Sequence, residues 1–456
     1  MQMNKELMAD LDRSGPRYTS YPSANLFGHY FGPQDLLNAL EQSNTAPARS
    51  LALYLHLPFC QQLCYYCGCT KIVTQNADKI KAYLPTVYRE ADLFAAAIDP
   101  EREVRQIHLG GGTPNTYSPL LLEEILDELR ARFKVAADAE IGLEVDPRCM
   151  KLSDLEEYRL AGFNRISIGV QDFDPAVQKA INREQSQALI AALIDEARFV
   201  GFNGINVDLV YGLPKQTLST FAHTLNDVIA MRPDRLAVYS YAHLPKQFKS
   251  QRLIQLNDLP TGEQKLELLE LAVSKLTAAG YRHIGMDHFA LPEDELARAL
   301  NSGQLQRNFQ GYSTRGGSDL LGLGMSAISS VGHVYAQNAK TLAVYTRHIE
   351  RGHFATVKGL TLTPEEDIRR DLIQRLMCSG KVDMDSFGAE HGIDFDRYFE
   401  RDLGRLKPYL QRGLITVSDH SLQVTETGRY LLRPMAMAFD PYMNQGETSG
   451  EFSKVI

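Results

Sequence analysis

Four of the six cysteines lie within ten residues of one another, between Cys60 and Cys69. Cys60, Cys64 and Cys67 follow a C-x3-C-x2-C spacing on one short segment. Three such thiolates can each bind one iron of a [4Fe–4S] cube, which normally takes four cysteines. The remaining iron then keeps an open coordination position, which the amino and carboxylate groups of S-adenosylmethionine can fill. Reduction of such a cluster can cleave the sulfonium of this ligand to a 5′-deoxyadenosyl radical.

Zinc is the alternative for the same thiols, with Cys69 or His56 as a fourth ligand. The chain has no second C-x2-C pair and no H-x3-H pair, so zinc is the less favoured interpretation. The segment from Cys67 to Cys69 is too tight for Cys69 to join the same cube, and Cys69 is predicted not to bind iron. The two isolated cysteines, Cys149 and Cys378, are predicted to be buried small apolar residues.

A second group of residues lies where predicted strands end. Gly110, Gly111 and Gly112 precede Thr113-Pro114 and match neither the dinucleotide fingerprint nor the phosphate-binding loop. They allow close approach of a ligand to the backbone, or they form a simple tight turn. In β/α barrels the active site is built from the carboxyl ends of the strands. The polar residues expected at that rim are Glu144, Asp146, Gln171, Asp208, Tyr241 and His243, with Arg183 in a helical stretch able to neutralise a carboxylate.

Short apolar segments alternate with amphipathic helical ones from about residue 50 onward. Gly162, Gly201 and Gly280 each follow a helical segment and can stop it in the left-handed conformation. Strands that alternate with helices predict a parallel sheet with right-handed crossovers, either a full or partial (β/α) barrel or a doubly wound open sheet. The predicted strands are 51–57, 104–109, 139–145, 165–170, 205–210 and 236–241.

Three parts of the chain are expected, with a fold of the α/β class. Residues 1–48 form an N-terminal arm, 49–338 the barrel, and 339–456 a smaller, mainly helical domain. The C-terminal domain begins a helix at the capping box Thr363-Pro364-Glu365-Glu366 and contains a short hairpin around 418–421. It is predicted to pack against the barrel; a winged helix that reads nucleic acid is the alternative.

Composition restricts the classes of partner. The 456 residues carry 48 Lys and Arg against 56 Asp and Glu, a net charge of −8, with no long basic run. Nucleic acid is therefore not expected as a partner, because phosphate binding depends on clustered cations. No secretory signal and no apolar stretch of about eighteen residues is present, so no membrane span is expected and the protein is predicted to be cytoplasmic.

In this order the motifs resemble the radical S-adenosylmethionine superfamily, and within it the oxygen-independent coproporphyrinogen III oxidases. The resemblance covers nearly the whole chain, and the glycine run after the cysteine triplet narrows it to this branch. One local departure is Leu109, where an aromatic residue can occur. The segments that carry the resemblance are 14–22, 64–69, 110–114, 144–148, 169–173, 211–214, 241–245, 285–289 and 307–312.

The resemblance implies a partial (β/α) barrel with the arm over the active site and a helical cap. It implies one [4Fe–4S] cluster on Cys60, Cys64 and Cys67 and two S-adenosylmethionine molecules. The first molecule would lie near Tyr54, Gly111, Glu144 and Ile328. The second would lie near Tyr66, Gly112, Thr113, Gln171, Arg183, Asp208 and Ala242. His56, Phe309 and Gln310 would belong near the reacting centre.

The implied reaction is the oxidative decarboxylation of two propionates of coproporphyrinogen III to vinyl groups, giving protoporphyrinogen IX. A tetracarboxylate needs cations, and Arg17 and Arg307 are the hypotheses for them. A reductant protein and an electron acceptor would be partners, and the chain is expected to be a monomer. Two alternatives remain open. Related haem-binding chaperones lack the arm at 14–22 and carry an aromatic residue in place of Cys69; a zinc-binding regulator would use the C-terminal hairpin.

Overall fold

The computed structural model describes residues 14–45, 49–444 and 452. Its centre is a twelve-stranded sheet in the order β16-β15-β14-β13-β1-β4-β5-β6-β7-β8-β10-β9. Seven neighbouring strands in the middle of this sheet are parallel. They are β13 (Asp319–Leu323), β1 (Leu51–Leu57), β4 (Glu103–Gly111), β5 (Lys134–Val145), β6 (Arg165–Gln171), β7 (Gly204–Tyr211) and β8 (Arg235–Ser240).

Antiparallel strands extend the sheet at both ends. One end carries β14 (Ile328–Val331), β15 (Val334–Asn338) and β16 (Thr356–Thr361), and the other carries β10 (His288–Ala290) and β9 (Arg282–Gly285). The two end strands, β16 and β9, do not pair with each other, so the barrel is not closed. β1 pairs with β13 although 268 residues separate Ser50 from Ser318, whose hydroxyls lie 2.7 Å apart.

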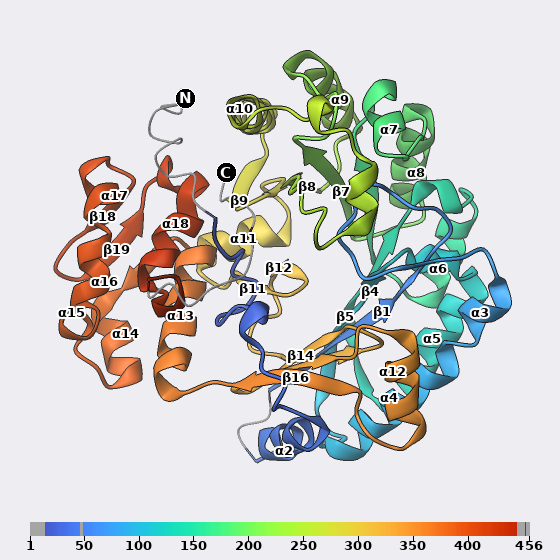
Figure 1. The fold of residues 1–456 in the computed structure, drawn as a ribbon, viewed down its shortest axis with the longest axis horizontal. Coiled ribbons are helices and arrows are strands. Elements are labelled where there is room, and N and C mark those ends of the chain that lie inside the picture. The colour runs from blue at the N-terminus through green and yellow to red at the C-terminus, as the bar shows by residue number, and fades with distance from the viewer. Residues whose placement is uncertain (1–13, 46–48, 445–451, 453–456) are drawn as a thin grey trace.

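The helices between the parallel strands lie on the outer side of the curved sheet (Figure 1). Ser118 caps α5 through the Leu121 amide, and Thr261 caps α10 through the Gln264 amide. Gly162 and Gly201 end α6 and α8 at φ of 113° and 86°, as the sequence predicts. The bounds of the helices between the parallel strands are α3 (Ala77–Lys81), α4 (Leu84–Ala97), α5 (Pro119–Arg132), α6 (Asp154–Ala161), α7 (Pro175–Ala180), α8 (Gln187–Phe199) and α9 (Leu218–Met231). Between the later strands lie α10 (Gly262–Ala278), α11 (Glu295–Ser302) and α12 (Leu342–Glu350).

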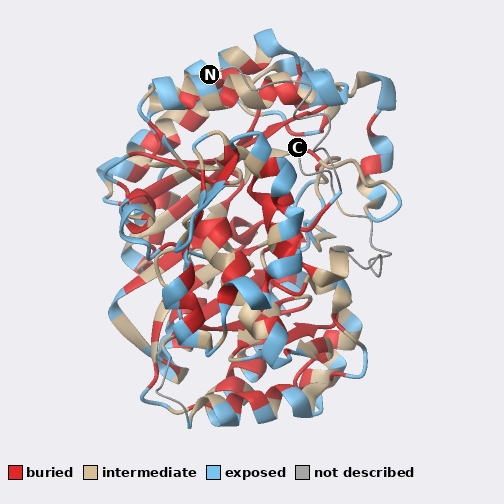
Figure 2. Cartoon of the chain, turned by 90° about the vertical axis from the view of Figure 1, so that its left-hand side faces the viewer, coloured by how far each residue is buried: buried red, intermediate tan, exposed pale blue. Residues whose placement is uncertain are grey.

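The largest apolar core lies between this sheet and its helices, and Figure 2 shows buried residues on the inward sides of these elements. Leu51, Leu53, Leu55 and Leu57 of β1 are at most 1% exposed, because alternate residues of a strand point to the same face, here the one that packs in the core with the helices. All six predicted strands are present, and the mixed α/β class with an incomplete barrel is confirmed.

The N-terminal arm runs between the sheet and the C-terminal helices and leads to α2 (Pro33–Ser43) (Figure 1). Gly28 pairs with Gly359 of β16, and the Phe27 ring stacks on Tyr335 with 5.6 Å between centroids. Arg433 donates hydrogen bonds to the carbonyls of Gly15 and Pro16 from the C-terminal side. The described part of the arm is therefore fixed by contacts at both ends.

The C-terminal part has its own apolar core, which includes Leu372, Phe387 and Phe399. Thr363 and Glu366 form the predicted capping box, and β18 (Ile415–Val417) and β19 (Ser421–Val424) form the predicted hairpin, joined by β17 (Lys381–Asp383). The twelve-stranded sheet extends beyond residue 338 to Thr361; the three-part division stays a prediction. The helices are α13 (Pro364–Cys378), α14 (Met384–His391), α15 (Phe395–Tyr398), α16 (Glu400–Arg405), α17 (Lys407–Gln411), α18 (Leu432–Ala436) and α19 (Pro441–Asn444).

In the described residues, no helix combines the length and the apolar character needed to cross a bilayer.

Candidate active site

The three cysteines of the triplet line one cavity of about 370 Å³ at the carboxyl ends of the parallel strands. They lie on the loop that leaves β1. The short parallel strands β2 (Phe59–Cys60) and β3 (Ile72–Val73) close the base of this loop. We call it the cluster loop (residues 58–73). It presents its thiols to the strand ends because β1 lies in the middle of the parallel block.

Each sulfur of the triplet accepts hydrogen bonds from the chain itself. Thr113 donates to Cys60 Sγ at 3.3 Å, and the Cys69 amide donates to Cys67 Sγ at 3.4 Å. Two arginines donate to Cys64 Sγ, Arg148 at 3.4 Å and Arg183 at 3.5 Å. Hydrogen bonds to ligating sulfurs and nearby positive charge are among the factors that set the potential of an iron–sulfur cluster.

Acid–base properties differ along the triplet. Burial raises the pKa of the Cys60 thiol to about 11. The pKa of Cys67 is lowered to about 6, first by hydrogen bonding from Cys69 and further by the charge of Lys71, although burial opposes the shift. Lys71 also donates to the Cys67 carbonyl at 3.0 Å. The loop thus favours the thiolate, the form that binds metal, at Cys67.

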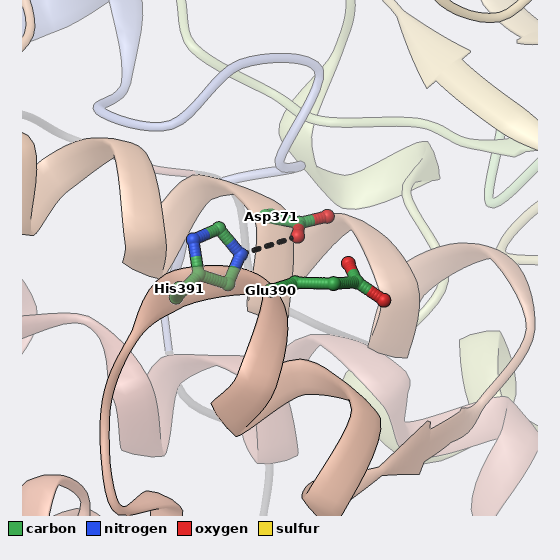
Figure 3. A group of neighbouring side chains, drawn as sticks. All are labelled: Asp371, Glu390 and His391. Carbon is green, nitrogen blue, oxygen red and sulfur yellow. Dashed lines mark hydrogen bonds and ion pairs between the residues drawn. The ribbon is translucent and has the colours of Figure 1, made fainter.

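Ligand spacing separates a cluster from a single metal ion. Tetrahedral zinc with bonds of 2.3 Å holds its sulfur ligands about 3.8 Å apart. Among the described residues, one group of three His, Cys, Asp or Glu ligand atoms lies within 4.8 Å of one another: Asp371, Glu390 and His391 (Figure 3). The cysteine triplet is not such a group, so its thiols are spread more widely than one zinc ion requires. This spacing and the donor set fit a larger iron–sulfur group.

Each glycine of the run is required by a different neighbour. A Cβ at Gly110 would lie 2.7 Å from Glu144 Oε1, and one at Gly111 would lie 2.5 Å from His56 Nδ1. A Cβ at Gly112 would lie 2.6 Å from the Pro58 backbone, and Gly111 has a φ of +111°. The run is therefore more than a turn, because it lets the end of β4 pack against β5 and the cluster loop.

Two connected polar groups lie behind the glycines. His108 Nε2 lies 3.0 Å from Glu144 Oε1, and the Gly111 amide donates to Glu144 Oε2 at 3.2 Å. Burial raises the pKa of Glu144, but the hydrogen bond and charge of His108 lower it overall. Burial lowers the pKa of His108, and the hydrogen bond and charge of Glu144 raise it overall. Charged His108 and Glu144 thus stabilise each other next to the glycine run.

The second group joins Tyr54 and His56 to the cluster loop. His56 Nδ1 lies 3.1 Å from the Tyr54 hydroxyl, and His56 Nε2 lies 2.9 Å from the Thr70 carbonyl. Burial lowers the pKa of His56, so the ring is neutral at pH 7. Both ring nitrogens are occupied by the protein, and neither Tyr54 nor His56 lines the cavity.

Asp146 and Arg183 form a buried ion pair at the opposite wall. Arg183 Nη1 donates to Asp146 Oδ2 at 3.0 Å, and Arg148 donates to the same carboxylate at 2.7 Å. The exposed fractions of the Arg183 and Asp146 side chains are 7% and 8%. Arg183 lies in the loop between α7 and α8, so the expected helical position is wrong. It also donates to the Gly169 carbonyl at 2.6 Å, which fixes its side chain across the ends of β5 and β6.

The remaining predicted cofactor residues line this same cavity, with two exceptions. Tyr66, Thr113, Gln171, Asp208 and Ala242 all belong to its wall. Gln251 joins two of them by donating to the carbonyls of Tyr66 at 2.8 Å and Ala242 at 3.1 Å. Burial raises the pKa of Asp208 to about 6, and the charge of Glu144 adds to the shift.

Besides Tyr54, the other exception among the cofactor residues is Ile328. It lies in a small apolar cluster with Phe309, Phe27 and Tyr335, and the Phe309 and Tyr335 rings meet edge-on with centroids 5.8 Å apart. The structure thus places Ile328 and Phe309 in one cluster with Phe27 of the arm, and neither of them lines the first cavity.

A second cavity of about 140 Å³ lies deeper in the barrel and shares Glu144, Ser167, Asp208 and Tyr239 with the first. Gln310 lines it from the hairpin of β11 (Gln306–Asn308) and β12 (Gly311–Ser313). Both amide atoms of Gln310 are buried without a hydrogen-bond partner. Since buried polar groups normally have partners, this side chain is suited to contact a ligand.

The two predicted substrate arginines differ sharply. Arg17 of the arm forms an ion pair with Asp287, close to the Tyr239 ring. Arg307 of β11 is 4% exposed, and its Nε and Nη1 have no partner. The charge of Arg17 is therefore neutralised within the described structure, whereas no described carboxylate neutralises Arg307.

Among the site residues that sequence reasoning missed are His108, Arg148 and Lys71. His108 lies on β4 two residues before Gly110, so the two residues point to the same face of the sheet. This alternation was the sequence signal that could have identified His108 as a site residue. Arg148 ends the segment 144–148 already singled out but was given no role there, and Lys71 follows the cysteines. Both are single basic residues without a pattern; the fold brings the Arg148 side chain to Cys64 and turns the Lys71 side chain back to the Cys67 carbonyl within the loop.

The comparisons agree with this geometry. A family model described as "Radical SAM superfamily" matches residues 54–228, and one described as "HemN C-terminal domain" matches 362–431. The fold and the site thus define a radical S-adenosylmethionine enzyme, a class that implies a [4Fe–4S] cluster and S-adenosylmethionine as cofactors.

Relatives of known name give the narrower family. The oxygen-independent coproporphyrinogen III oxidase of Salmonella typhimurium is 46% identical over 99% of this chain and 98% of its own length. That of Pseudomonas aeruginosa is 44% identical over 100% and 99%. A solved structure of the Escherichia coli coproporphyrinogen III oxidase, described as a radical SAM enzyme, matches with a TM-score of 0.92 and 45% identity over 97% of this chain and 99% of that chain. The chain belongs to the oxygen-independent coproporphyrinogen III oxidase family.

Proposed function

We propose that this protein converts coproporphyrinogen III to protoporphyrinogen IX without oxygen, as a step of haem biosynthesis in the cytoplasm. The observation that carries the proposal is the triplet Cys60, Cys64 and Cys67, whose three sulfurs accept hydrogen bonds from the protein and line a cavity at the strand ends. Relatives that cover nearly the whole chain carry the name of this activity.

The cofactors would bind at different parts of the rim. The three cysteines would hold one [4Fe–4S] cluster. One S-adenosylmethionine would lie against Gly111 and Glu144, with Tyr54 and Ile328 nearby. A second molecule would lie against the residues of the opposite wall, namely Tyr66, Gly112, Thr113, Gln171, Arg183, Asp208 and Ala242. When bound, the reduced cluster with S-adenosylmethionine supplies a 5′-deoxyadenosyl radical that can remove a hydrogen atom from the β-carbon of a propionate.

The protein's own residues have positioning roles in this proposal. His56 fixes the cluster loop through the Thr70 carbonyl, because both of its ring nitrogens are engaged there and at Tyr54. Gln310 offers an unpartnered amide to the substrate in the second cavity, and Phe309 supports the hairpin that carries it. A radical requires a site with little water, which the strand ends beneath the arm can provide.

Electron balance requires two partners. Each decarboxylation releases CO2 and one electron beyond the abstracted hydrogen atom, so an electron acceptor is needed. The cleavage of S-adenosylmethionine consumes one electron, so a reductant protein is needed as well. We propose that the protein is a monomer when it interacts with the reductant protein and with the electron acceptor.

The test is an anaerobic assay of cluster-reconstituted protein with reductant, S-adenosylmethionine and coproporphyrinogen III. We expect protoporphyrin after oxidation of the products, and none from Cys64→Ser, whose iron content should also fall. Cys69→Ser is the matched control, because Cys69 is predicted not to bind iron and should keep the full iron content. An intact cluster without protoporphyrin would refute the oxidase function, and haem binding by that sample would then favour a chaperone.

A further inference from the structure

A third cavity, of about 380 Å³, lies between the barrel and the C-terminal domain and is rich in arginine. Arg307 and Arg315 line it from the β11–β12 hairpin and the loop that follows. Arg370 lines it from α13, and Arg49 from the segment before β1. We call these four residues and the cavity between them the arginine pocket. Their convergence from three separate parts of the chain makes this a built feature of the fold.

The three carboxylates of the pocket are already paired, Asp319 and Asp371 with cations outside the four arginines and Asp367 with Arg370 of the pocket itself. Asp319 pairs with the buried Arg102, and its exposed fraction is 3%. Asp367 pairs with Arg370 and His333. Asp371 pairs with Arg375 and His391, which also makes the group in Figure 3 an ion-pair network rather than a candidate metal site. None of these acids is described as a partner of Arg307.

Arg307 is the central cation of the pocket. Its side chain is 96% buried, its Nε and Nη1 have no partner, and its guanidinium lies 4.7 Å from the centroid of the Tyr312 ring. The Gln374 side chain of α13 donates to its backbone carbonyl at 3.3 Å and fixes the strand in place. Burial of a charge without a counter-charge is costly, and an anionic ligand would offset this cost.

The pocket adjoins the barrel interior. Ser313 lines both the arginine pocket and the second cavity, and the second cavity shares Glu144 and Asp208 with the cavity of the cysteines. A ligand that extends across the β11–β12 hairpin can therefore approach all three.

We propose that the arginine pocket binds a carboxylate of the tetrapyrrole substrate, a propionate other than the one that reacts. This inference rests on the proposed function, since it takes the tetracarboxylate as the ligand. Guanidinium groups bind carboxylates through two parallel hydrogen bonds, which fixes the direction as well as the position of the ligand. The C-terminal domain thereby acquires a role in substrate binding through Arg370, in addition to packing.

The test is equilibrium binding of coproporphyrin III, the air-stable porphyrin with the same four propionates, to anaerobic holoenzyme, followed by fluorescence quenching. We expect Arg307→Gln to weaken binding at least about tenfold, because one charge-assisted contact is lost. Arg307→Lys, which keeps the charge without the planar fork, should recover part of this loss. Arg347→Gln on α12, an exposed arginine outside the pocket, is the matched control and should bind as the unmodified protein does.

Arg49→Gln is a second test of the pocket in case the Arg307 variants do not fold. Because Arg49 is exposed, its substitution should leave the fold intact. It should weaken binding a few-fold and reduce the salt dependence. The tetramethyl ester of coproporphyrin, which has no charge, should bind all variants alike. Unchanged coproporphyrin affinity in both Arg307→Gln and Arg49→Gln would overturn the inference. Binding of inorganic phosphate is measured in the same variants. If the variants lose phosphate binding but keep coproporphyrin binding, the inference is also overturned, and the pocket is assigned to free anions. Conversion of coproporphyrinogen III by the unmodified protein is assayed separately. A failure of the proposed function can therefore be distinguished from a failure of the inference about the arginine pocket.

Discussion

The cluster-loop rim and the β11–β12 hairpin both face the inside of the barrel, but the polar atoms of the rim are more completely hydrogen-bonded than those of the hairpin. At the rim, Arg148 and Arg183 both donate to Asp146 and to Cys64 Sγ, and of these three side chains only Arg183 has a buried atom, Nε, without a partner among the described residues. At the hairpin, Arg307 and Gln310 are buried with polar atoms that have no partner among the described residues.

This difference indicates two kinds of preparation for a ligand. The rim is preorganised, because its charges are already oriented by protein contacts before any cofactor binds. At the hairpin, buried polar atoms without hydrogen-bond partners destabilise the fold, and a ligand with matching groups would remove this destabilisation. A cofactor that remains through many turnovers suits the first arrangement, and a substrate that must enter and leave suits the second.

Among the substitutions that test this comparison, the largest change in stability is expected at the rim. Arg183→Met leaves Asp146 with one arginine instead of two and removes the bond to the Gly169 carbonyl. The free energy of unfolding should fall by about 2 kcal/mol, since the buried Asp146 carboxylate loses one of its two charged partners and keeps only Arg148. Thermal unfolding of the cofactor-free protein measures this, with exposed Arg347→Met as the control. Equal stability of the two variants would contradict a preorganised rim.

The hairpin should respond with the opposite sign. Gln310→Leu removes two buried amide atoms that lack partners, so the free energy of unfolding should rise by about 1 kcal/mol while protoporphyrin formation falls. Gln304→Leu, at an exposed position on the same segment, is the control and should change neither quantity. Loss of stability in Gln310→Leu would show that the amide has a structural partner and would remove the contrast with the rim.

The smallest effect concerns pH and the His108–Glu144 pair. The folded protein raises the pKa of His108, so the pair stabilises the fold below the ordinary histidine pKa of about 6.5, and this contribution is lost as pH rises through the raised value. Because Glu144 is 43% exposed, the contribution should be about 1 kcal/mol or less. The stability difference between the unmodified protein and His108→Gln should therefore shrink from pH 6 to pH 8.5 in thermal unfolding. A difference that grows over this range would contradict the ion pair.

The rim was largely predictable from the sequence because its residues follow strands directly. Glu144, Gln171 and Asp208 lie at or near the carboxyl ends of β5, β6 and β7, and parallel strands bring those ends together whatever the details of packing. The three helix-stopping glycines, at 162, 201 and 280, were readable for the same reason, since a local backbone requirement leaves a local signal.

The hairpin and the strands beside it were not predictable in this way. β13 (Asp319–Leu323) is a five-residue segment that contains a glycine, and its partner β1 is far away in the sequence. The position of Arg307 against α13 and the ion pair of Arg17 with Asp287 are also long-range contacts. Charge alone made both arginines candidates, and the fold distinguishes the paired one from the unpaired one.

The pairing of β1 with β13 also has a consequence for the order in which the protein is made. At about 5–20 residues per second, a ribosome needs roughly 13–54 s to extend the chain by the 268 residues that separate these strands. During this interval β1 can pair with β4 but has an unpaired edge on its other side, next to the cluster loop. The wall that carries the cysteines is therefore synthesised first, and the nascent chain must be protected from edge-to-edge association until β13 emerges.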